Sequence, residues 1–193
     1  MCDHVGRELA GRKPDVHLNA AGHAQAERLA EQLDAIHLDA VFSSPLPRAR
    51  ETAAPLAERR KLELQIEDDF TEIDYGDWTG KKIDSLAGES LWSRYNALRS
   101  VARIPGGEQL LDVQARAVSV LDAIRRAHPD GCCAIVSHGD VIRSIVAHCA
   151  GIPLDLFQRL EIAPASVSVV VLAESWIGVR SMNVPIDGLR QIV

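Results

Sequence analysis

The sequence predicts an α/β fold, a three-layer sandwich in which helices cover both faces of a mostly parallel β-sheet. Short apolar runs such as LDAVFSS and CCAIVS are typical of buried strands, and they alternate with segments of helical periodicity. Strands that alternate with helices form parallel sheets buried on both faces. Only 4% of the 193 residues are aromatic, so we expect one domain over residues 1–193 with an aliphatic core.

The first third of the sequence predicts two helices and two strands. A helix over residues 20–36 would be capped by Asn19. Its buried face repeats at helical spacing, with Ala26, Leu29, Ala30 and Leu33. The run LDAVFSS predicts a strand that ends near Ser43. Residues 45–60 predict a helix with proline in its first turn, which Pro55 would kink or split, and LELQI alternates as a strand.

The remaining sequence opens with EDDFTEIDYGDWTG, which has no clear period and predicts a surface loop, the kind of segment that often carries function. Residues 83–99 and 107–128 predict helices separated by the ARIPGG break. The strand CCAIVS leads into the helix GDVIRSIVAHCA, which stops at Gly151, and a short helix is expected at residues 154–159. The sequences SVSVVVLAE and WIGVRSMNV predict two strands joined by a tight turn.

Composition limits the classes of partner. The net charge is −6 and there is no run of Lys or Arg, so nucleic acid is a poor partner, although a locally basic pocket can still bind a small anion. No apolar run is long enough to span a membrane, so we expect no membrane partner. The four cysteines form no C-x-x-C pair or zinc spacing, which predicts reduced thiols in a cytoplasmic protein. We expect no metal and no cofactor. The oligomeric state is not readable, and a homodimer stays open.

Two strand-to-helix junctions carry candidate binding residues. FSSPLPRA places Arg48 in the first helical turn after a strand, and VSHGD places His138 at a strand end, with Gly139 allowing close approach of a ligand. A guanidinium, an imidazole and a helix N-terminus suit a phosphate group. Glu72, in a loop rich in glycine and aromatic residues, is a candidate proton donor. Taken alone, each residue is more often a surface, capping or packing residue; the combination is the feature that favours a site.

Four segments, SSPLPRARETA, TEIDYGDWTG, PGGEQL and VSHGDVIRS, resemble in order and spacing the histidine phosphatase superfamily, also called the phosphoglycerate mutase-like fold. The similarity covers essentially the whole chain. In that family a histidine attacks a phosphoryl group, and water or an alcohol resolves the phosphohistidine. The resemblance implies that Arg48 is the pocket arginine, Glu72 the proton donor or acceptor and His138 the second pocket histidine. It gives Glu108 and Arg116 a more structural role.

The family's Arg-His-Gly motif, which comes after its first strand and supplies the nucleophile, is absent from this sequence. The opening MCDHVGRELAGR is similar to the family's segment just beyond that motif, so the resemblance implies a first strand, an arginine and a nucleophile upstream of residue 1. Without that strand, two rows of backbone groups and a slot in the core would be exposed. The alternatives are a pseudoenzyme that only binds phosphorylated ligands and a substitute nucleophile, for which His4 is the nearest candidate.

The resemblance implies a phosphomonoester hydrolase that acts on a small phosphorylated substrate, with a phosphoglycerate mutase as the enzymatic alternative. Only 35 residues separate Glu72 from Gly107, a compactness that favours the phosphatase. The region over residues 83–103 is expected to cover the site. Its Trp92, Arg94 and Tyr95 would either touch the substrate or, as is more common at helical spacing, serve packing and the surface. The identity of the phosphomonoester is not readable from the sequence.

Overall fold

The computed structural model describes residues 1–3 and 5–191, so the candidate nucleophile His4 lies outside the described residues. The strands are β1 (Ala40–Ser43), β2 (Leu64–Ile66), β3 (Cys133–Val136), β4 (Val167–Leu172) and β5 (Ile177–Val184). The helices are α1 (Ala20–Gln32), α2 (Pro47–Arg60), α3 (Ile83–Leu86), α4 (Ser90–Ala97), α5 (Leu110–Ala127) and α6 (Gly139–Ala150). Short 3₁₀ turns are η1 (Asp68–Phe70), η2 (Gly76–Trp78), η3 (Leu154–Arg159) and η4 (Ile186–Gln191).

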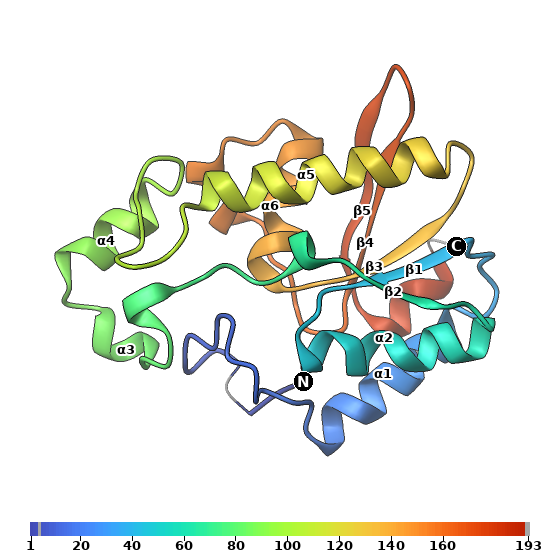
Figure 1. Ribbon diagram of the computed structural model, residues 1–193, viewed down its shortest axis with the longest axis horizontal. Helices are drawn as coiled ribbons and strands as arrows, with labels where there is room; N and C mark the ends of the chain where they lie inside the picture. The colour runs from blue at the N-terminus through green and yellow to red at the C-terminus, as the bar shows by residue number, and fades with distance from the viewer. Residues whose placement is uncertain (4, 192–193) are drawn as a thin grey trace.

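A parallel sheet with the strand order β2-β1-β3 lies at the centre of the molecule (Figure 1). Helices α1 and α2 cover one face, and α5 and α6 cover the other. β1 pairs with both neighbours, so that Val41 lies opposite Leu64 and Ala134, and all four of its residues are buried. Val41 packs into the hydrophobic cluster under α1 and α2, whereas Phe42 packs into the cluster under α5 and α6. The predicted three-layer α/β fold is confirmed.

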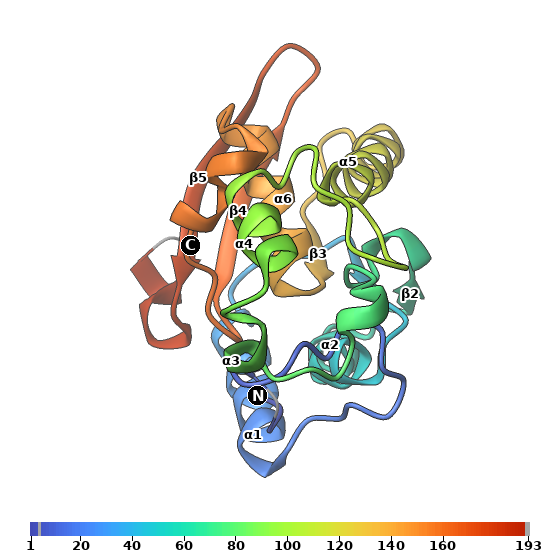
Figure 2. The same ribbon diagram turned by 90° about the vertical axis from the view of Figure 1, so that its left-hand side faces the viewer.

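β4 and β5 form a second, antiparallel sheet, and their hairpin projects beyond the neighbouring elements (Figures 1 and 2). Within the described residues, β3 pairs only with β1 and β4 only with β5. β3 and β4 are rich in apolar residues, yet all of their residues are only half-buried. Ala134 and Val167 contribute to one hydrophobic cluster, and Ile135 and Val170 to the other. Among the described residues, β3 and β4 therefore border the same core, and each has one edge that pairs with no strand.

Helix α1 begins where the sequence predicts but ends earlier. The Asn19 side chain accepts a hydrogen bond from the Gly22 N–H at 2.8 Å, which confirms the predicted cap. The helix stops at Gln32 instead of continuing to residue 36. Arg60 of α2 donates hydrogen bonds to the carbonyl oxygens of Leu33 and Ile36, so a residue from another helix satisfies acceptors at this end of the helix.

Two other helix predictions need correction. α2 continues through Pro55 and is not split there, since burial of Ala53 and Leu56 on either side keeps the helix against the sheet. The single helix expected over residues 83–99 is two helices, α3 and α4, because the chain is extended at Glu89 after Gly88. α6 stops at Gly151 as predicted, with φ at 68°.

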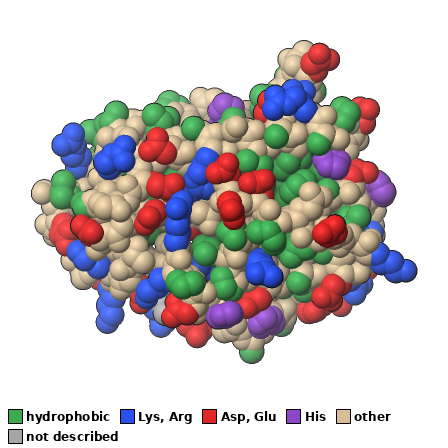
Figure 3. Space-filling view, in the orientation of Figure 1, with side chains coloured by type: hydrophobic (Ala, Val, Ile, Leu, Met, Phe, Trp, Pro, Cys, Tyr) green, Lys and Arg blue, Asp and Glu red, His purple; other side chains and the backbone are tan. Residues whose placement is uncertain are grey.

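Figure 3 shows one face of the molecule, on which basic and acidic side chains lie intermixed. None of the helices in the described part of the chain has the length and apolar character needed to cross a bilayer.

Candidate active site

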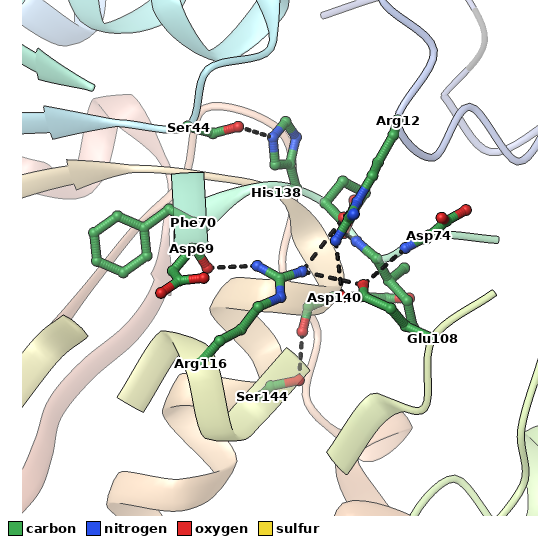
Figure 4. A network of polar contacts seen from close by, with 12 residues as sticks. Arg12, Ser44, Asp69, Phe70, Asp74, Glu108, Arg116, His138, Asp140 and Ser144 are labelled. Carbon is green, nitrogen blue, oxygen red and sulfur yellow. Dashed lines mark hydrogen bonds and ion pairs between the residues drawn. The ribbon is translucent and has the colours of Figure 1, made fainter. Parts of the chain in front are cut away.

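The carboxyl ends of β1 and β3 bring Ser44 and His138 together. The imidazole Nε2 of His138 lies 2.7 Å from Ser44 Oγ, and the residue is only 6% exposed (Figure 4). Burial, followed by the positive charges of Arg48 and Arg116, lowers the pKa of His138 well below its usual value. The ring is therefore neutral at pH 7. Because Ser44 Oγ also accepts from the Leu46 N–H at 3.3 Å, its own hydrogen is free to point at Nε2.

Arg48 is the second residue of α2, at the junction the sequence singled out. Its Nη2 donates to the carbonyl oxygen of Gly11 at 2.8 Å, whereas Nη1 is buried and has no hydrogen-bond partner among the described residues. A buried N–H of a charged group without an acceptor is costly. Arg48 also lies within electrostatic range of both Glu72 and His138. The predicted guanidinium, imidazole and carboxylate therefore share one electrostatic environment.

Glu72 lies in the loop between η1 and η2, and its Oε1 accepts a hydrogen bond from the Ile73 N–H at 3.0 Å. Desolvation, followed by the negative charge of Asp140, raises the pKa of Glu72 to about 8, although Arg48 and Arg116 act in the opposite direction. At pH 7 the carboxyl is thus mostly protonated. A protonated carboxyl near an arginine and a neutral histidine can donate a proton to a departing oxygen.

Two arginines and one glutamate hold the Glu72 loop in place (Figure 4). Arg12 Nε donates to the Glu72 carbonyl oxygen at 2.9 Å, and Arg116 Nη2 approaches the same oxygen at 3.4 Å. Glu108 bridges the two arginines, with its Oε1 at 2.8 Å from Arg12 and its Oε2 at 3.3 Å from Arg116, and it accepts from the Asp74 N–H at 3.0 Å. These contacts support the structural role that the resemblance gives Glu108 and Arg116.

Sequence reasoning missed Arg12, Tyr75 and Asp140. The Tyr75 hydroxyl donates to Asp140 Oδ2 at 2.7 Å, which joins the Glu72 loop to the first turn of α6. Asp140 was visible in VSHGD, immediately after the candidate glycine, and Arg12 is the last residue of MCDHVGRELAGR, the segment similar to the family's segment just beyond its Arg-His-Gly motif. Neither residue has a local pattern that marks it, because each acts through a contact with a segment far away in sequence.

Gly139 opens α6, and a Cβ placed on it would meet no atom within 4 Å. No other atom of the described residues therefore fills the space next to Gly139 at the start of α6. In the region over residues 83–103, which is expected to cover the site, two aromatic side chains pack inward. Tyr95 is fully buried and its ring centroid lies 5.4 Å from that of Trp78, while that of Trp92 lies 5.2 Å from Trp78. Trp92 and Tyr95 are thus packing residues and Arg94 is exposed.

The Glu72 loop also contacts the PGG segment backbone to backbone. Gly76 has φ at +46°, and a Cβ on it would lie 2.3 Å from the Pro105 carbonyl oxygen. We expect Gly76→Ala to lower the free energy of unfolding by about 2 kcal/mol or more, because the backbone strain and the clash act together. Urea denaturation measures this. Gly139→Ala is the matched control, and an equal loss of stability in both variants would contradict the explanation.

Within residues 1–3 and 5–191, no group of three or more His, Cys, Asp or Glu side chains is arranged to hold a metal ion. A surface hollow of about 370 Å³ lies elsewhere, between α5 and the end of α6. Its lining includes Ser100, Leu111, Gln114 and His148 and contains no Arg or Lys, so it lacks the guanidinium that the candidate site offers.

Comparison with known proteins agrees with the motifs. Residues 3–185 match the family model of the histidine phosphatase superfamily, branch 1. Phosphoserine phosphatase 1 of Hydrogenobacter thermophilus is 31% identical over 182 residues, which cover 93% of this chain and 85% of that protein. Mycobacterial glucosyl-3-phosphoglycerate phosphatase, solved in complex with VO3, has a TM-score of 0.84 at 26% identity, over 95% of this chain and 94% of its own. Bacillus stearothermophilus YhfR has a TM-score of 0.85 at 26% identity, over 92% and 89%. The chain therefore belongs to the histidine phosphatase superfamily.

Proposed function

We propose that this protein hydrolyses small phosphomonoesters through a phosphohistidine, without a metal ion or cofactor. The observation that carries the proposal is the buried Nη1 of Arg48, which has no acceptor among the described residues. A phosphate oxygen supplies such an acceptor. The phosphatase relatives support the same class of reaction. We also propose a cytoplasmic location, because Cys2, Cys132, Cys133 and Cys149 are all free thiols.

In the proposed reaction a histidine nitrogen attacks phosphorus, the N–P bond forms and the P–O bond to the leaving group breaks. Arg48 donates to the phosphoryl oxygens. When Ser44 donates to Nε2 of His138, Nδ1 carries the ring proton and donates to another oxygen. Glu72 gives its proton to the leaving oxygen. Water then attacks phosphorus, Glu72 takes the water proton, and the N–P bond breaks to release phosphate and regenerate the histidine.

We propose that a strand filling the space between β3 and β4 supplies the nucleophile. This rests on the unpaired, half-buried edges of those two strands. A strand parallel to β3 would end beside Ser44 and His138, since the carboxyl ends of parallel strands lie at one edge of a sheet. Met1 accepts a hydrogen bond from the Asn19 N–H at 3.1 Å, and Cys2 lies within electrostatic range of Arg48. The Met1 amino group itself contacts Gln25 of α1 at 3.0 Å, so polypeptide upstream of Met1 would start beside α1, one residue before Cys2.

Extending the chain with the gene's own upstream codons should give a protein that hydrolyses an aryl phosphate and forms a phosphohistidine upstream of Met1. If the nucleophile lies upstream of residue 1, as proposed, the 193-residue chain should not turn over the aryl phosphate. A turnover assay measures hydrolysis of the aryl phosphate, and mass spectrometry detects the acid-labile phosphoryl adduct. An adduct on His4 would instead support the substitute nucleophile. Phosphate-dependent thermal stabilisation without turnover in the extended chain would favour the pseudoenzyme.

A further inference from the structure

Asp140 occupies an unusual place for a carboxylate in this site. It stands in the first turn of α6, two residues after His138, and its side chain is only 12% exposed. Three donors surround it. Tyr75 donates from its hydroxyl at 2.7 Å, Arg143 Nη1 lies at 3.1 Å, and Arg99 Nη1 lies at 3.6 Å. None of the steps of the proposed reaction uses this carboxylate directly.

These contacts connect three separate segments. Tyr75 belongs to the Glu72 loop, three residues after the carboxyl that would donate the proton. Arg99 follows α4 and stacks over the rings of Tyr95 and Phe157, with centroid distances of 4.1 and 4.8 Å. Oδ2 of Asp140 is the oxygen that faces Tyr75 and Arg99, whereas Oδ1 faces Arg143. The carboxylate therefore anchors the Glu72 loop to the helix that begins beside His138.

The charges around Glu72 come from several elements. Arg48 of α2 and Arg116 of α5 lower the pKa of Glu72, and Asp140 of α6 is the carboxylate that raises it. Two phenols of the same network, Tyr75 and Tyr95, are within range of the Glu72 charge. Arg12 contacts the Glu72 backbone oxygen and not the carboxyl. The negative charge of Asp140 thus disfavours the ionised form of Glu72, which Arg48 and Arg116 favour.

We propose that Asp140 is a positioning residue, which fixes the Glu72 loop through Tyr75 and keeps the proton on Glu72 against the pull of Arg48 and Arg116. This rests on the proposed role of Glu72 as proton donor. The charge and the hydrogen bond are separable by substitution. Asp140→Asn removes the charge but keeps an oxygen that can accept from Tyr75, and Tyr75→Phe removes the hydrogen bond but keeps the charge.

The test is a ¹³C NMR titration of the glutamate carboxyls in the folded chain, with the Glu72 signal assigned by its loss in Glu72→Gln. In Asp140→Asn the Glu72 midpoint should fall by about one pH unit, whereas Tyr75→Phe and Asp140→Glu should keep it raised. An unchanged or higher midpoint in Asp140→Asn would overturn the proposal, as would an equal fall in Tyr75→Phe.

This titration does not depend on turnover, so it separates the two proposals. If the extended chain fails to hydrolyse phosphomonoesters while the midpoint still moves, the proposed function fails and the coupling stands. Asp140→Asn also leaves the buried Arg99 without its carboxylate, which is expected to destabilise the fold. If that variant does not fold, Asp140→Glu and Tyr75→Phe test the proposal. A Glu72 midpoint that falls to the usual range of a glutamate in Asp140→Glu, which keeps the charge, would refute the role of the charge.

Discussion

His138→Ala in the chain extended upstream of Met1 should lower turnover of an aryl phosphate by about 10²–10³-fold, because it removes a preorganised donor to the transferring phosphoryl group. The imidazole is buried, neutral and oriented by Ser44, so it is ready to donate without reorganisation. Steady-state kinetics measure the loss. We expect it mainly in kcat, since the donor strengthens its contact as charge develops on the phosphoryl oxygens.

His148→Ala is the matched control for this substitution. His148 lies on the same helix but is exposed and lines the hollow between α5 and α6, away from Arg48 and Ser44. Its loss should leave turnover close to that of the parent. Thermal denaturation of both variants tests for misfolding. A fully folded His138→Ala protein with turnover like that of His148→Ala would refute the assignment.

Glu72→Gln should stabilise the fold while it removes the proton donor. The pKa of Glu72 is about 8 in the folded protein, against about 4.3 for a glutamate in an unfolded chain. Between these values the unfolded state loses its proton while the folded state keeps it, so the free energy of unfolding falls as pH rises from about 4 to 8. Glutamine escapes this penalty and can still accept from the Ile73 N–H.

The stabilisation by Glu72→Gln should therefore be small near pH 4 and reach a few kcal/mol near pH 8, according to about 1.4 kcal/mol for each unit of pKa difference. Urea denaturation across this pH range measures the increment. In the extended chain the same variant should turn over substrate at least about 10²-fold more slowly. A stability difference that does not change with pH would contradict the raised pKa. Glu67→Gln is the control, because Glu67 caps η1 through an exposed contact with the Asp69 N–H.

The candidate site could be predicted from sequence only where it depends on local pattern. Arg48 and His138 stand at strand-to-helix junctions, and the order of strands and helices places such junctions at one edge of the sheet. Arg12 and Asp140 were missed because their roles come from contacts with Glu72 and Tyr75 across 60 and 65 residues of sequence. No periodicity or capping signal encodes such a pairing.

The same distinction explains the errors in the fold. Just past the early end of α1, the carbonyl oxygens of Leu33 and Ile36 accept hydrogen bonds from Arg60 of another helix, a contact that no sequence window around residue 33 contains. Pro55 carries a strong local signal for a break, but burial of the neighbouring face of α2 outweighs it. Tertiary contacts therefore decided the outcome wherever the local signal and packing disagreed.

The strand edges of β3 and β4 that pair with no other strand in the described part of the chain have a consequence for behaviour in solution. Their sequences, CAIV and VSVVVL, contain no charge and no proline, the features with which proteins usually discourage strands of other molecules from pairing. At high concentration such edges can recruit one another and promote aggregation. The proposed strand that brings the reacting histidine to the site would also cover these edges. The same segment would then supply the nucleophile and prevent self-association.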